Sequence, residues 1–169
     1  MREVTLPIEA RTPARDFESF FRAEYRALCQ ALLLLVGDAF EAEEIAQETM
    51  TRVLERWDRV GLMEYPTGYA YRTALNLQRK RIRRLAVRAR RRFAPAPVAD
   101  VGAEAGDRQD VRRALGALPE GQRAALILVD WLDMDTDEAA RVLGIKPASV
   151  RVRLHRARSA LRDALGATS

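Results

Sequence analysis

Residues 135–162 read DTDEAARVLGIKPASVRVRLHRARSALR, and this stretch decides the fold of the C-terminal part of the chain. Asp135 and Glu138 have the three-residue spacing of a capping box, which predicts that a short helix begins here. Gly144 suits the left-handed position that ends such a helix, and Pro147 suits the first turn of the next one. Apolar residues at helical spacing predict the buried sides of the two helices: Ala139, Ala140, Val142 and Leu143, then Val150, Leu154, Ala157 and Leu161. The stretch therefore has the spacing of a helix-turn-helix.

The second of these helices presents a polar face opposite its apolar stripe. With a step of about 100° per residue, Val152, His155 and Arg156 lie on that face, and Arg151 and Arg153 flank it. Guanidinium groups at the edges suit phosphate and the centre suits base edges, as in major-groove recognition. An isolated basic helix is more often a solvated surface, but the cap, the glycine turn and the proline together favour DNA. Ser149 is expected to bond phosphate directly, because Lys146 is a weak residue for capping this helix.

Charge alternates in blocks along the chain. Residues 76–95 carry nine basic and no acidic residues, and residues 141–169 carry seven basic residues and one acidic residue. Residues 1–75 and 96–140 are each net acidic, whereas the whole chain has a net charge of +5. Two separate basic segments indicate a polyanionic partner, most simply nucleic acid, and the acidic blocks are typical either of a second, basic partner or of plain solubility.

The remainder of the chain has helical periodicity and weak strand signals. We expect one helix to begin after Asp16 and a second to begin after Asp38. The second helix has a predicted buried stripe of Ala46, Met50, Val53, Leu54 and Trp57. A loop over 58–65 follows, and a third helix is expected to begin at Pro66. Residues 94–106, rich in Ala, Pro and Gly, read as a linker. The sequence thus predicts an all-α protein with two small helical domains and a flexible linker: a tail over 1–16, a domain over 17–92, the linker over 93–107 and a second domain over 108–169.

Two helical faces of the first domain carry polar groups. In the second helix Glu43, Glu44, Gln47 and Glu48 form an exposed acidic face, which on its own is usually only solvated. In the third helix one side carries Arg72, Asn76, Arg79, Lys80 and Arg83, a row that suits a phosphate backbone, with Asn76 suited to a base. Trp57, Tyr69 and Tyr71 suit base stacking, although aromatic residues at helical spacing more often belong to a core.

The order of these motifs resembles that of a known family. AEEIAQETMTRVLERW (42–57), PTGYAYRTALNLQRKRIRR (66–84), a linker and then ALPEGQRAALILVDWLDMDTDEAARVLGIKPASVRVRLHRARSALR (117–162) resemble bacterial sigma-70 factors. The chain is similar to the compact extracytoplasmic-function (ECF, group 4) class, which has only region 2, a helical bundle, and region 4, a helix-turn-helix. The resemblance covers about residues 17–165.

The resemblance implies a role for each matching residue. Glu43, Glu44, Gln47 and Glu48 would dock on the β′ coiled coil of core RNA polymerase, and Arg72, Asn76, Arg79, Lys80 and Arg83 would contact the −10 element, where the loop 58–65 and Asn76 would hold a flipped base. Ser149, Arg151, Val152, Arg153, His155 and Arg156 would contact the −35 element. The apolar segment RAALILVDWL would support the reading helix and meet the polymerase β flap. Whether an anti-sigma factor is a further partner stays open.

This sequence departs from the family pattern in one place that matters. Many relatives have an Asp four residues after the Asn that corresponds to Asn76, whereas this chain has Lys80. A lysine there adds affinity for the DNA backbone and leaves the −10 sequence open. The −35 sequence is open as well, because Val152 contacts a thymine methyl but donates no hydrogen bond.

The sequence argues against several other classes of protein. One cysteine, Cys29, and one histidine leave no set of residues for a metal site or a catalytic triad, so we expect neither enzyme activity, cofactor nor metal. The longest apolar run and the N-terminus fit neither a membrane span nor a signal peptide, which predicts a cytoplasmic protein without membrane insertion. The alternative function is a conventional helix-turn-helix transcriptional regulator. That alternative explains 135–165 but neither the acidic helix nor the first basic row.

Overall fold

The structure is a computed structural model that describes residues 16–91 and 107–166. Apart from Asp16 and Asp107, the predicted tail and linker lie outside these ranges. Within them the chain is helical and has no strand, as predicted. The first part consists of α1 (Phe17–Val36), α2 (Ala39–Leu54), the short α3 (Trp57–Val60) and α4 (Pro66–Arg91). The second part consists of α5 (Asp107–Ala117), α6 (Glu120–Leu126), the π-helical segment η1 (Ile127–Trp131), α7 (Thr136–Leu143) and α8 (Pro147–Gly166).

Local capping sets the ends of α1 and α2. The Asp16 carboxylate accepts a hydrogen bond from the backbone N–H of Ser19 at 2.8 Å, and Asp38 accepts one from Glu41 at 2.7 Å. Each bond satisfies a donor that the first turn of a helix leaves without an intrahelical partner. Gly37, with φ of 85°, ends α1 in the left-handed region, so the chain reverses and α2 packs along α1. Both predicted N-caps are confirmed.

The buried side of α2 is shifted from the predicted stripe. Ala46, Met50 and Val53 are buried, but Leu54 is 53% exposed, so its predicted burial is wrong. Ile45 and Thr49 are fully buried in its place, and the Thr49 hydroxyl donates to the carbonyl of Ile45 at 2.7 Å. The centre of the stripe thus lies one residue earlier, and Leu54, the last residue of the helix, points past the packed surface.

Helix α4 is longer than the motif that predicted it. The motif that matches the family ends at Arg84, whereas the helix continues to Arg91. The physical reason is that Leu, Ala and Arg are all good helix formers and that neither Gly nor Pro occurs between Gly68 and Pro95. At the other end, part of the predicted loop 58–65 is also helical, because α3 reaches Val60.

The helix-turn-helix has the predicted local geometry. Asp135 and Glu138 form a reciprocal capping box, with bonds of 2.8 and 3.0 Å. Gly144 has φ of 68° and ends α7, and α8 begins at Pro147. The predicted inner residues of α7 and the residues Val150, Leu154 and Ala157 of α8 are buried. Leu161, further along α8, is half-buried and packs at the edge.

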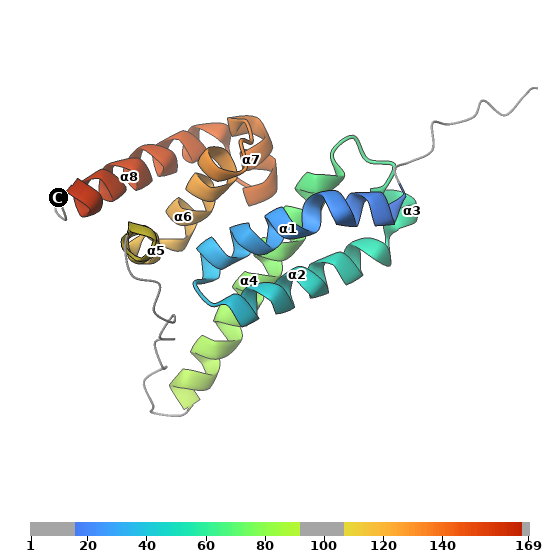
Figure 1. Cartoon of the computed structure of the whole chain (residues 1–169), viewed down its shortest axis with the longest axis horizontal. Coiled ribbons are helices and arrows are strands. Elements are labelled where there is room, and N and C mark those ends of the chain that lie inside the picture. The colour runs from blue at the N-terminus through green and yellow to red at the C-terminus, as the bar shows by residue number, and fades with distance from the viewer. Residues whose placement is uncertain (1–15, 92–106, 167–169) are drawn as a thin grey trace, which may run out of the picture.

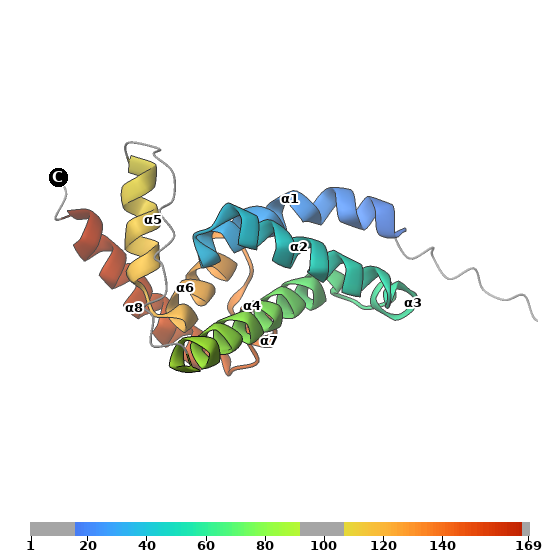
Figure 2. The same ribbon diagram turned by 90° about the horizontal axis from the view of Figure 1, so that it is seen from below.

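The two parts pack against each other. Figure 1 shows α6 beside the end of α1, and Figure 2 shows α7 against α4. Leu32 and Leu35 of α1 and Ala74 of α4 belong to the same buried cluster as Ile127 and Leu128 of the second part. One hydrophobic core therefore joins the helices that were predicted to form separate domains.

Arg123 on α6 adds polar contacts to this junction. Its guanidinium donates to the carbonyl of Leu35 at 2.7 Å and to that of Leu118 at 3.1 Å, with a longer bond of 3.4 Å to Gly116. Burial lowers the pKa of Arg123 from its ordinary value. The side chain thus closes the end of α1 against the connection between α5 and α6.

Candidate nucleic-acid and docking surfaces

Three helical faces carry the candidate site residues. The α2 acidic face is Glu43, Glu44, Gln47 and Glu48; the α4 stripe is Arg72, Asn76, Arg79, Lys80 and Arg83; the α8 outer face is Ser149, Arg151, Val152, Arg153, His155 and Arg156. Each face has a different set of contacts with the rest of the protein.

The α2 acidic face divides into two rows. Glu43 and Gln47 form the first row, in which the Gln47 amide donates to the Glu43 carboxylate at 3.3 Å and both side chains are exposed. This row lies near α1, where burial raises the pKa of the Tyr25 hydroxyl and the Glu43 charge adds to the rise. Burial likewise raises the pKa of Cys29, a half-buried free thiol. The first row is thus open to a partner, whereas the prediction had treated the whole face as uniform.

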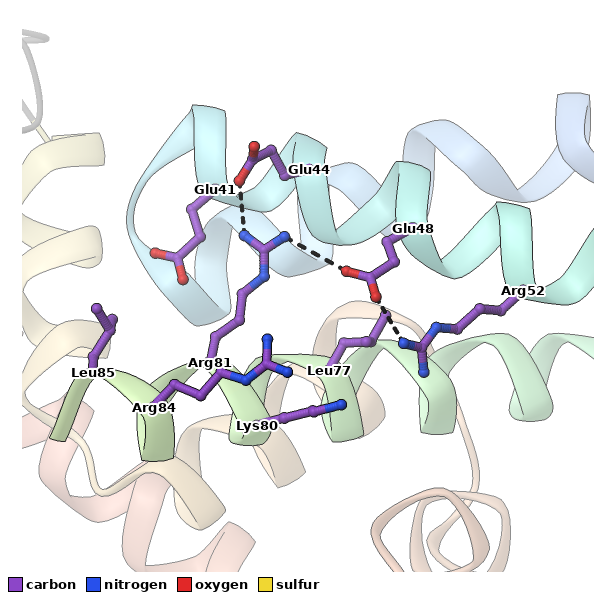
Figure 3. Close-up of a pocket in the computed structure, with 9 residues that line it drawn as sticks. All are labelled: Glu41, Glu44, Glu48, Arg52, Leu77, Lys80, Arg81, Arg84 and Leu85. Carbon is purple, nitrogen blue, oxygen red and sulfur yellow. Dashed lines mark hydrogen bonds and ion pairs between the residues drawn. The ribbon is translucent and has the colours of Figure 1, made fainter. Parts of the chain in front are cut away.

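The second row, Glu44 and Glu48, faces α4. Arg81 donates to the Glu44 carboxylate at 2.8 Å, and its other terminal nitrogen lies 3.7 Å from Glu48. Arg52 pairs with the second oxygen of Glu48 at 2.7 Å (Figure 3). These side chains line a groove of about 520 Å³ between α2 and α4, together with Glu41, Leu77, Lys80, Arg84 and Leu85. The second row is therefore an ion-pair network as well as an acidic surface.

The α4 stripe is mostly exposed. Arg72, Asn76, Lys80 and Arg83 are exposed, and Arg83 donates through Nε to the carbonyl of Arg79 at 3.3 Å. Arg79 is half-buried, because its Nε lies 3.4 Å from the Glu120 carboxylate on α6. The structure therefore brings the five residues to one side of α4, and the second part of the chain already contacts one of them.

Arg72 lies at the same junction, further towards the start of α4. It lines a shallow groove with Asp137, Arg141 and the helix-turn-helix residues Gly144 and Lys146. Arg72 and the turn between α7 and α8 are therefore neighbours in this arrangement.

Packing inside the protein accounts for the aromatic residues that suited base stacking. Trp57 packs on Phe17 and Phe20, with ring centroids 5.5 and 5.0 Å apart. Tyr71 is 4% exposed, and burial raises the pKa of its hydroxyl. Tyr69 accepts a hydrogen bond from Arg56 at 3.0 Å, which lowers the Tyr69 pKa. The core interpretation is therefore correct for Trp57 and Tyr71.

The loop before α4 has exposed apolar side chains that pattern reading missed. Leu62 is 54% exposed and Met63 is 36% exposed. Gly61 holds the loop close to α3, because a Cβ at this position would lie 2.9 Å from the Trp57 ring. Two neighbouring apolar residues in a stretch without helical period are the sequence signal that could have identified them.

The α8 outer face is anchored from behind and open in front. Val150 and Leu154 are buried, while Val152 is 50% exposed and Ser149, Arg151, His155 and Arg156 are exposed. Arg158 fixes the helix to η1 through two bonds to Asp130, of 3.0 and 2.5 Å. These contacts leave a polar face free on a helix held by its apolar face.

Arg153 differs from the rest of the α8 outer face. It is half-buried and lies over Gly121 on α6, where an added Cβ would come 2.9 Å from its Nη1. The glycine thus makes room for this guanidinium, and Arg153 flanks the open face from the side of α6.

Two searches of the described residues bear on other kinds of site. Across residues 16–91 and 107–166, no helix combines the length and apolar character needed to cross a membrane. Nor do three His, Cys, Asp or Glu side chains in that part of the chain come together as metal ligands.

The same two segments match known families. Residues 20–92 match the family described as Sigma-70 region 2, and residues 108–161 match Sigma-70, region 4. The chain is 30% identical over 152 residues to an RNA polymerase sigma-E factor of Streptomyces avermitilis, which covers 89% of this chain and 85% of that protein. It is also 30% identical over 154 residues to the ECF RNA polymerase sigma factor SigM of Mycobacterium tuberculosis, covering 89% of this chain and 77% of the relative.

A solved structure gives the same fold. The sigma factor RpoE of Bartonella quintana, in complex with the anti-sigma factor NepR, matches with a TM-score of 0.80 at 23% identity, over 89% of this chain and 97% of that one. The likeness extends over both parts of the fold and so includes the way in which they pack. Together, the two family matches and the relatives show that the chain belongs to the sigma-70 family of RNA polymerase sigma factors, in its extracytoplasmic-function group.

Proposed function

We propose that this sigma factor binds core RNA polymerase through the α2 acidic face and reads promoter DNA with α4 and α8. The observation that carries the proposal is the exposure of α8: its inner residues are buried and its polar outer face is open. A helix held in this way presents side chains to a major groove without losing its own packing. The proposed domain division, with region 2 over 17–92 and region 4 over 108–169, assigns one DNA surface to each.

At the −35 element the α8 outer face acts through two kinds of contact. Arg156 and His155 occupy the centre of the face and reach base edges, while Arg151 and Arg153 grip phosphates on either side. Val152 contributes apolar contact with a thymine methyl. Ser149, at the start of the helix, bonds phosphate through its hydroxyl and the nearby backbone N–H groups.

At the −10 element the α4 stripe follows the backbone. Arg72, Lys80 and Arg83 contact phosphates, and the Asn76 amide takes a base that has left the stack. The loop 58–65 supports that base with the exposed side chains of Leu62 and Met63. Capturing an unpaired base offsets its unpairing cost, which is a few kcal/mol. The protein therefore opens DNA by binding alone, in the cytoplasm, without catalytic residues.

The partner surfaces follow from what remains exposed. The β′ coiled coil meets the α2 acidic face. The segment that matches RAALILVDWL is buried from Ala124 to Leu128, whereas Trp131 is 53% exposed. Contact with the β flap is therefore assigned to Trp131 rather than to the whole apolar segment. The complex of the RpoE relative with an anti-sigma factor supports a search for a partner of that class here.

The alternative, a conventional helix-turn-helix regulator, leaves half of the chain unexplained. Such a regulator uses residues 135–165 but has no role for the acidic helix or the α4 stripe. The match of residues 20–92 to Sigma-70 region 2 favours the sigma function.

In-vitro transcription with sigma-free core polymerase tests the proposal. We expect the full chain to bind core and to direct initiation from selected promoters. Reversing the charges of Glu43 and Glu44 should weaken core binding, whereas reversing Glu18, an exposed acid on α1 paired with Arg22, should not. A chain that does not bind core, or that binds without directing initiation at any promoter, contradicts the proposed function.

A further inference from the structure

Arg81 lies within the basic run of α4 but outside the α4 stripe. Two residues along an α-helix correspond to a rotation of about 200°, so Arg81 points away from both Arg79 and Arg83. In the structure it points to α2, and its side chain is 26% exposed (Figure 3). Arg81 therefore pairs with side chains of the same protein, although Lys80 of the α4 stripe lines the same groove.

The guanidinium of Arg81 joins two carboxylates of the α2 acidic face. One terminal nitrogen donates to Glu44 at 2.8 Å, and the other lies 3.7 Å from Glu48. Arg52 holds the remaining oxygen of Glu48 at 2.7 Å. Only a planar, forked cation spans two acids in this way, whereas a lysine ammonium is a single point of charge. The second row of the face is therefore ordered from α4 before any partner arrives.

The two carboxylates remain available to a partner. Their side chains are 47% and 40% exposed, for Glu44 and Glu48 respectively. Each carboxylate has two oxygens with about four acceptor sites in total. The same carboxylate can therefore accept hydrogen bonds from Arg81 and from an incoming cation at once. Ion pairs this exposed contribute little to folding stability. The larger effect of Arg81 is to fix side chains that otherwise lose rotamer freedom on binding.

We propose that Arg81 is a positioning residue of the core-polymerase docking site: it holds Glu44 and Glu48 in the geometry that the polymerase meets. This inference rests on the proposed function, since it assigns the α2 acidic face to core polymerase. It divides the basic run by role, with Arg81 serving the docking face and Arg83, two residues further on, serving DNA.

The experiment compares full-length Arg81→Ala with Arg83→Ala, a matched loss of one charge from the same helix. Affinity for core polymerase is measured by fluorescence titration, and promoter binding is measured with holoenzyme assembled at saturating sigma. We expect Arg81→Ala to weaken core binding by about three- to tenfold, the effect of one or two side chains left unordered. Arg83→Ala should leave core affinity unchanged and lower the slope of log affinity against log salt for promoter DNA by about 0.9.

Two further variants separate positioning from a structural or direct role. In a Glu44→Gln/Glu48→Gln background, Arg81→Ala should have no additional effect on core binding, because its partners are already neutral. Arg81→Lys should recover part of the affinity. Melting temperatures of all variants are measured alongside, and we expect Arg81→Ala to melt close to the wild type.

The remaining outcomes overturn the inference. Unchanged core binding by Arg81→Ala means that the arginine does not position Glu44 and Glu48. Tighter core binding means that the arginine masks these carboxylates from the polymerase. If Arg81→Ala weakens core binding in the Glu44→Gln/Glu48→Gln background by the same factor as in the wild type, Arg81 acts on the polymerase directly or through stability. A lower salt slope for Arg81→Ala means that it contacts phosphate. If the wild type itself does not bind core, the proposed function fails; if the wild type binds and Arg81→Ala binds equally well, only this inference fails.

Discussion

Removal of the partly buried Arg123 side chain is expected to destabilise the protein, and its contacts set the size of the effect. Its two shorter bonds, to the carbonyls of Leu35 and Leu118, are charge-assisted, and a bond of this kind is worth about 1.5–3 kcal/mol. Burial of the guanidinium opposes this gain, as the lowered pKa shows, and its Nε has no hydrogen-bond partner among the described residues. We therefore expect Arg123→Ala to lower the free energy of unfolding by about 2–3 kcal/mol.

Urea denaturation followed by far-UV circular dichroism measures this change. The midpoint should fall without a change in slope, and the melting temperature should fall by about 4–12 °C, given about 2–4 °C per kcal/mol for a chain of this size. Arg113→Ala is the matched control, because Arg113 is 71% exposed and pairs with Asp110 on its own helix. A loss below about 1 kcal/mol, or a loss equal to that of the control, would refute the idea that Arg123 closes the junction.

Four other changes test separate parts of the structure. Gly144→Ala should cost about 1 kcal/mol in chemical denaturation, because φ is 68° there; an unchanged midpoint would contradict this strain. Leu154→Ala should cost about 2–5 kcal/mol, because the side chain is 4% exposed; a smaller loss would mean that the site collapses around the gap. Arg156→Ala should cost about 1–3 kcal/mol at one −35 position in competition binding, whereas a uniform loss across sequences would mark a phosphate contact. The hydrogen bond from the Ser19 N–H lowers the pKa of Asp16 in the folded protein below its value in the unfolded chain. The resulting stabilisation is present above the unfolded pKa and is lost as pH falls through the folded pKa. Asp16→Asn should remove this part of the acid sensitivity, as measured by unfolding at a series of pH values.

Local chemistry was predictable from sequence where a residue acts on its own neighbours. The caps at Asp16, Asp38 and Asp135 and the left-handed Gly144 each depend on atoms within about four residues, and all are found as predicted. The family was predictable as well, because the spacing of motifs survives where individual residues vary.

Contacts between distant segments were not predictable in the same way. Periodicity gives the face of a helix but not the element that covers it, so Leu54 was placed in the core by pattern and lies in solvent in the structure. Arg81 bonds Glu44, which lies 37 residues away, and Arg123 bonds the Leu35 carbonyl, which lies 88 residues away. The helical rotation of α4 does place Arg81 off the stripe. A single sequence does not show, however, that Arg81 pairs with Glu44 on α2. The roles of the α2, α4 and α8 residues in binding stay predictions.

If Arg79 contacts promoter DNA as proposed, its ion pair with Glu120 competes with that contact inside the protein. A phosphate that takes Arg79 must displace a carboxylate carried by the same chain, whose local concentration does not fall on dilution. If a fraction f of molecules has this pair open, the measured dissociation constant is the intrinsic constant divided by f. A partly exposed pair worth about 0.2–1 kcal/mol sets the factor 1/f at roughly two to six. Glu120→Gln, which neutralises the partner of Arg79 without adding a positive charge, is therefore expected to tighten promoter binding.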